Sequence, residues 1–202
     1  MGGAYSSPPG LRIGTLGGLS LTLDGRPVDD LVSRRTEALL VYLACARRPQ
    51  SREALADLLW DERDQTQAAG NFRVIVNSLR RSLGAFVEAN RYSIGMNLAS
   101  AFTLDVADFE AAAQAALRDA SKPDRALLFQ AAGLYRGDFL AGLSLPEGRR
   151  FEEWVMLERE RLRRLQIEVL DALVDAAGRD RHHRAGVDLA TRLLQIDPLR
   201  ES

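Results

Sequence analysis

The chain has 202 residues, a formal net charge of −1 and 46% hydrophobic residues, values typical of a globular protein with one or two domains. Its apolar runs are too short to span a membrane, so no membrane partner is expected. The single cysteine, Cys45, excludes an internal disulfide and indicates the cytoplasm as the compartment. Residues 1–10 are rich in Gly, Ser and Pro and are predicted to form a flexible tail.

A small sheet is predicted at the start of the chain. Residues 11–23 alternate roughly between apolar and polar side chains, which is typical of half-buried strands. They end in Asp24-Gly25, a hairpin turn signal, and the strand pattern resumes at residues 26–28.

Two short helices follow the predicted sheet. Apolar side chains at helical spacing predict a helix over residues 34–46, with Ser33 as its N-cap. A second helix is predicted up to Trp60, with Ser51 as its N-cap. The first half of the chain is therefore expected to mix short strands with short helices.

A third helix is predicted over residues 67–83, ending at Gly84 as a left-handed C′ glycine. Steps of about 100° per residue separate a buried stripe from an opposite, exposed face. No acidic residue occurs between Gln65 and Val87. The buried stripe contains Phe72, Ile75, Val76, Leu79 and Leu83. The exposed face contains Gly70, Val74, Asn77 and Arg81, flanked by Arg73 and Arg80.

After the third helix, strands are predicted at residues 86–89 and 92–96 around a hairpin at Asn90-Arg91, and a last strand at residues 102–104. From Val106 onward only amphipathic helices are predicted. They cover residues 109–117, 123–135, 151–177 and 183–196.

The last of these helices ends with features of a tetratricopeptide repeat. We therefore expect the helices to pack as antiparallel pairs. The apolar stripe of Leu189, Leu193 and Leu194 predicts that the helical array is truncated at residue 202, or that self-association covers the stripe.

In order and spacing, the segments resemble the SARP family of bacterial regulators, which combines an OmpR-type winged helix with a bacterial transcriptional activator domain. The first half is similar in Leu11-Arg12-Ile13, residues 38–44, residues 52–60 and residues 71–84. The second half is similar in Leu104-Asp105-Val106, residues 135–140, Trp154, residues 158–162 and residues 197–201. The resemblance implies promoter binding, recruitment of RNA polymerase and further helices beyond this chain.

We therefore predict a mostly helical protein with small β elements. Residues 11–105 are expected to form the winged helix-turn-helix domain, and residues 106–202 a tetratricopeptide-like activator domain. The expected function is sequence-specific binding of double-stranded DNA by a transcription regulator, and activation in particular.

The exposed face of the third helix has two possible roles. It could simply be solvated, as most polar helix faces are. It could instead contact DNA, because Val74 suits a thymine methyl group, Asn77 can bind adenine, and Arg73, Arg80 and Arg81 can bind guanine or phosphate. The position of the helix before a hairpin favours DNA. Arg91 at the hairpin tip could reach a minor groove or a phosphate, or it could serve solubility alone.

Enzymatic and metal-binding functions have little support in the sequence. Gly14, Gly17 and Gly18 lie between strands and not at a strand-to-helix turn, so they do not indicate a nucleotide site. His182 and His183 are adjacent and would point about 100° apart on a helix. No cofactor is expected. The alternative function is a protein-interaction module whose winged helix is a docking platform that does not read DNA.

Overall fold

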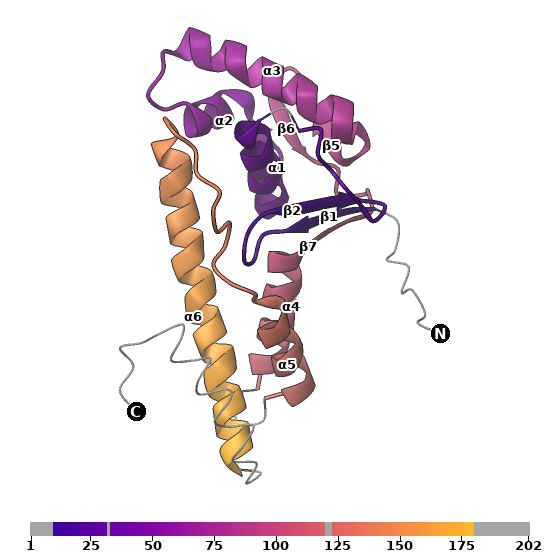
Figure 1. The fold of residues 1–202 in the computed structure, drawn as a ribbon, viewed down its shortest axis with the longest axis vertical. Helices are drawn as coiled ribbons and strands as arrows, with labels where there is room; N and C mark the ends of the chain where they lie inside the picture. The colour runs from indigo at the N-terminus through magenta and orange to yellow at the C-terminus, as the bar shows by residue number, and fades with distance from the viewer. Residues whose placement is uncertain (1–9, 32, 120–122, 180–202) are drawn as a thin grey trace.

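The computed structural model describes residues 10–31, 33–119 and 123–179. It begins with the predicted sheet, in the strand order β3-β2-β1-β7 (Figure 1). The strands are β1 (Leu11–Gly14), β2 (Ser20–Leu23), β3 (Arg26–Pro27) and β7 (Phe102–Leu104). Asp24 and Gly25 have φ angles of 50° and 79°, as a two-residue hairpin requires. The sequence did not predict the parallel pairing of β1 with β7.

Three helices form the centre of the first half: α1 (Arg34–Ala46), α2 (Arg52–Leu59) and α3 (Gln65–Leu83). Ser33 and Ser51 cap α1 and α2, which confirms both predicted N-caps. Asp64 caps α3 by accepting from the N–H groups of Thr66 and Gln67, so α3 begins two residues earlier than predicted. The prediction for Gly84 is wrong: its φ is −59°, and the chain continues into the 3₁₀ turn η1 (Gly84–Phe86).

A second small sheet forms the predicted hairpin. It consists of β4 (Gln50–Ser51), β6 (Ser93–Met96) and β5 (Val87–Ala89), in that order. The hairpin strand β6 pairs with β4, and β4 directly precedes α2. The hairpin is therefore hydrogen-bonded to the segment that begins α2. The sheet, three helices and hairpin make up the expected winged helix.

The second half contains α4 (Asp105–Leu117), α5 (Arg125–Leu134) and α6 (Arg149–Arg179). The N–H of Asp124 donates to the carbonyl of Ala116 across the α4–α5 connection, and the two helices pack against each other. Residues 135–148 then return to the winged helix, and α6 runs from α2 down past α4 and α5 (Figure 1). The expectation of antiparallel pairs depended on connections of a few residues, and the connection between α5 and α6 is longer than that. The predicted helix at residues 183–196 lies outside the described residues.

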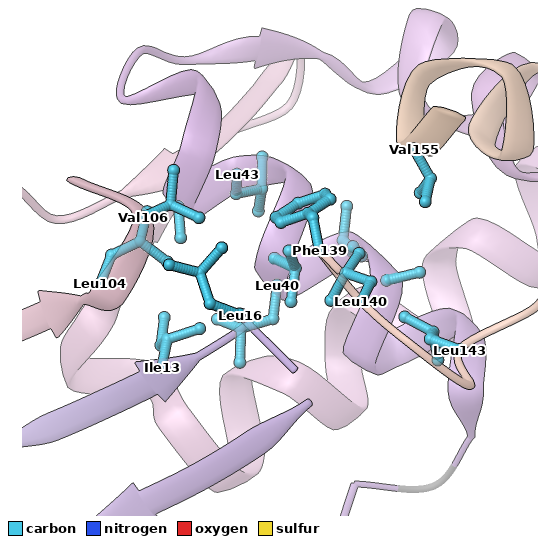
Figure 2. Packing of buried hydrophobic residues seen from close by; sticks show 14 of the residues in the cluster. Ile13, Leu16, Leu40, Leu43, Leu104, Val106, Phe139, Leu140, Leu143 and Val155 are labelled. Carbon is cyan, nitrogen blue, oxygen red and sulfur yellow. The ribbon is translucent and has the colours of Figure 1, made fainter. Parts of the chain in front are cut away.

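One apolar core joins the two halves (Figure 2). Ile13 and Leu40 from the winged helix pack in the same cluster as Phe139 and Val155 from the second half. No gap in this packing marks the predicted domain boundary between residues 105 and 106. The division into two domains therefore stays a prediction.

Backbone contacts reinforce this junction. The N–H of Leu140 donates to the carbonyl of Thr15 at 2.8 Å, and the N–H of Gly17 donates to the carbonyl of Asp138 at 3.2 Å. A Cβ atom on Gly17, whose φ is +90°, would lie 3.1 Å from the backbone of Arg136. Gly17 thus permits a close approach between the β1–β2 turn and residues 135–140.

Candidate nucleic-acid interface

The exposed face of α3 is the one predicted from the sequence. Arg73, Asn77, Arg80 and Arg81 are all exposed, and Val74 retains 62% of its surface. The opposite stripe is buried in the core, as predicted. Figure 1 shows α3 along the outer edge of the winged helix, on the side away from α4 and α5.

The arginines of this face lack acidic partners. Within the described ranges, no ion pair forms at Arg73, Arg80 or Arg81. The helix itself contains no carboxylate, and its N-cap Asp64 lies at the far end from Arg80 and Arg81. The face therefore carries uncompensated positive charge, which suits a polyanion.

The hairpin tip has a defined conformation. The Asn90 side chain accepts from the N–H groups of Tyr92 and Ser93, both at 2.8 Å, which fixes the turn. Arg91 stacks on the Tyr92 ring, with 4.6 Å between the guanidinium carbon and the ring centroid. Arg91 and Tyr92 are both exposed, so the tip presents the Arg91 guanidinium stacked on the Tyr92 ring.

Arg52 joins two parts of this surface, a role that sequence reasoning missed. Its guanidinium donates to the carbonyl of Asn90 at 3.3 Å and lies 5.5 Å from the centroid of the Phe72 ring on α3. Its N–H donates to the carbonyl of Tyr92 at 2.9 Å. Arg52 thus connects the hairpin to α3. No sequence signal could have found this link, because its three partners are distant in the chain.

Comparison with known proteins finds a family match in the second half of the chain. Residues 104–202 match the family described as "Bacterial transcriptional activator domain". The second half of the chain is therefore similar to bacterial transcriptional activator domains, and it is called the activator domain below. This activator domain thus covers the second half of the chain and begins in β7.

Two regulators are similar in sequence to the chain. The regulatory protein AfsR of Streptomyces coelicolor is 29% identical over 95% of this chain and 19% of AfsR. The transcriptional regulatory protein EmbR of Mycobacterium tuberculosis is 31% identical over 42% of this chain and 22% of EmbR. The matched regions span about a fifth of each relative's length. The resemblance to SARP regulators is confirmed, and the chain is related to transcriptional regulators.

A solved structure is similar in fold. It is described as "Mycobacterium tuberculosis EmbR in complex with low affinity phosphopeptide", with a TM-score of 0.59 and 23% identity, covering 92% of this chain and 54% of that one. The similarity confirms a winged helix followed by a helical array. Separately, no described helix is long and apolar enough to cross a bilayer.

Two arginines of α1 donate hydrogen bonds to carbonyls of the connection between α5 and α6. At the start of α1, Arg34 donates to the carbonyl of Gly142, and Arg35 to those of Leu59 and Pro146. The charged side chains of α6 form pairs both within the helix and with other segments. Glu160 does pair with Arg164, but Arg163 binds Asp138 in the preceding connection.

The remaining candidates fit structural roles. Trp154 contacts Tyr42 of α1 and Phe139, at centroid distances of 4.9 and 5.5 Å, so it is an interface residue. Burial raises the pKa of the Cys45 thiol, which disfavours the reactive thiolate. Among the described residues, no three His, Cys, Asp or Glu side chains gather as metal ligands would. His182 and His183 lie outside those residues.

Proposed function

We propose that the chain binds double-stranded DNA sequence-specifically, with α3 as the recognition helix in the major groove. The observation that carries the proposal is the exposed face of α3, whose three arginines have no ion-pair partner in the described part of the chain and whose helix contains no acid. A positively charged helix face beside a hairpin is the arrangement that winged helices use to contact both groove and backbone.

Each side chain on this face has a proposed contact. Val74 packs on a thymine methyl group, and Asn77 forms paired hydrogen bonds with adenine. Arg73, Arg80 and Arg81 bind phosphate or guanine. At the hairpin tip, Arg91 contacts a phosphate or enters the minor groove, with Tyr92 supporting its guanidinium.

We further propose that the bound protein activates transcription by contacting RNA polymerase. Support comes from the activator-domain family and from the two related regulators. Self-association on DNA with repeated sites is compatible with this role.

Selection of bound sequences from random duplexes tests DNA reading. A recovered motif, bound more tightly than a scrambled duplex at the same salt concentration, is the expected result. If no motif emerges and affinity is equal for all duplexes, the proposal fails. In that case the exposed Val74 and its neighbours fit the alternative function, a docking platform for another protein.

A further inference from the structure

Residues at the start of α6 contact the turn between α2 and α3. Residues 60–64 connect α2 to α3, and Asp64 at their end is the N-cap of α3. Three residues before that cap, Asp61 accepts a hydrogen bond from the N–H of Arg149, the first residue of α6, at 3.1 Å. Asp61 thus links the start of α6 to the turn that leads into α3.

Asp61 is a buried carboxylate whose contacts come from α6. Its side chain is 2% exposed, and the Nε of Arg149 lies 3.6 Å from Oδ2. Among the described residues, no donor hydrogen-bonds Oδ2. The N-terminus of a helix attracts negative charge, so the start of α6 compensates an anion that would otherwise be costly to bury.

Further contacts surround this anchor. Arg63 makes two hydrogen bonds to one carboxylate oxygen of Glu147, at 3.0 and 2.7 Å. From α1, Arg35 lies over the Trp60 ring at 5.3 Å and also donates to the carbonyl of Pro146. The turn is therefore held on both sides of Asp61 by residues 146–149.

We propose that Asp61 and Glu147 are positioning residues, through which the activator domain fixes α3 for DNA reading. This inference rests on the proposed function. Base contacts need side chains held within about 0.5 Å by a supporting layer of contacts. The exposed face of α3 has no other described element packed on it, so its placement depends on its buried stripe and on this anchored turn.

Three acid-to-amide variants of the full chain test this inference, each raising the net charge equally. Asp61→Asn and Glu147→Gln disturb the anchored turn. Glu160→Gln is the matched control, because among the described residues its carboxylate forms an ion pair only with Arg164 of the same helix. Each variant is titrated with the selected duplex and with a scrambled duplex, and its melting temperature is measured.

Asp61→Asn is expected to reduce the affinity ratio between the two duplexes about five- to tenfold, a typical coupling between sites. Glu147→Gln should change it in the same direction by less, because its carboxylate is more exposed. Amide exchange without DNA should accelerate in the first turns of α3 in Asp61→Asn, while α1 stays protected.

A merely structural role would lower the melting temperature and leave the ratio of the folded variant unchanged. Equal ratios in the parent and all three variants would overturn the inference while leaving the proposed function intact. If Asp61→Asn does not fold, the affinity ratio of Glu147→Gln between the two duplexes tests the inference in its place. A parent that selects no sequence would overturn the proposed function and this inference together.

Discussion

Two helices of this protein carry several arginines, and the two sets differ in what they bind. On α6, most arginines contact the protein itself. Arg161, for example, pairs with Glu110 of α4 and with Glu158. On α3, by contrast, Arg73, Arg80 and Arg81 have no ion-pair partner among the described residues. An arginine-rich helix therefore indicates a nucleic-acid surface only where its charges lack partners.

The difference has an energetic basis. An arginine that already binds a carboxylate or a carbonyl would have to give up that contact to bind a phosphate. An unpaired, exposed arginine loses only hydration, and it releases counterions from the DNA when it binds. The four predictions that follow separate residues that act through stability from residues that act through binding.

The largest effect is expected in the core beneath α6. Phe139→Ala removes a side chain that is 1% exposed and packs edge-on against Trp154. It should lower the free energy of unfolding by about 3–5 kcal/mol, as truncation of buried aromatic residues does. Chemical denaturation followed by tryptophan fluorescence measures this. A loss below about 1 kcal/mol would contradict the shared core of the two halves.

Arg159→Ala should destabilise the fold without affecting base discrimination. Arg159 donates to the carbonyls of Phe139 and Leu140, at 2.7 and 2.8 Å, and its loss leaves both without this donor. We expect a stability loss of about 2–3 kcal/mol, typical of hydrogen bonds to charged groups. The affinity ratio of the folded fraction should match that of the parent. A changed ratio would place this side of α6 in DNA reading.

Asn77→Ala should have the opposite profile. The side chain is exposed on α3, so the melting temperature should stay close to that of the parent. Affinity for the selected duplex should fall by about 1–3 kcal/mol and preference should relax at one base position, while non-specific affinity changes little. Parallel titrations of selected and scrambled duplexes, with thermal melts as the control, measure both quantities. Parent-like affinity for both duplexes would remove Asn77 from the reading surface.

The smallest effect is expected for an arginine paired on the surface of α6. Arg164 pairs with Glu160 four residues earlier at 2.8 Å, and both side chains are exposed. Arg164→Gln should change stability by about 0.3–0.5 kcal/mol, the usual size for such helix pairs. Thermal melts at low and high salt measure it. A loss above about 1 kcal/mol would show that the pair belongs to a larger network.

Local signals in the sequence predicted much of this molecule. Helical spacing and the caps at Ser33 and Ser51 gave α1 and α2, and the turn signal at Asp24-Gly25 gave a hairpin. The exposed and buried sides of α3 also follow from spacing alone. These features depend on residues that are near one another in the chain, which is why sequence patterns reveal them.

Long-range contacts escaped the sequence analysis. The parallel pairing of β1 with β7 joins Leu11 to Phe102, and no periodicity encodes such a partner. On α6, Arg149 and Arg163 bind Asp61 and Asp138, and no spacing within the helix indicates these partners. The sequence predicted the exposed face of α3 as the candidate site. It did not predict the contacts of Arg52 or of the turn at residues 60–64, because these contacts join residues that are distant in the chain.

The most direct test of the contrast between α3 and α6 is the salt dependence of DNA affinity. It compares the parent with Arg81→Gln on α3 and Arg164→Gln on α6, two variants that lose the same charge. Because each neutralised phosphate contributes about one unit to the slope of log affinity against log salt, Arg81→Gln should reduce the slope by about one and Arg164→Gln should leave it unchanged. Equal slopes for the two variants would contradict the assignment of α3 as the DNA-binding surface.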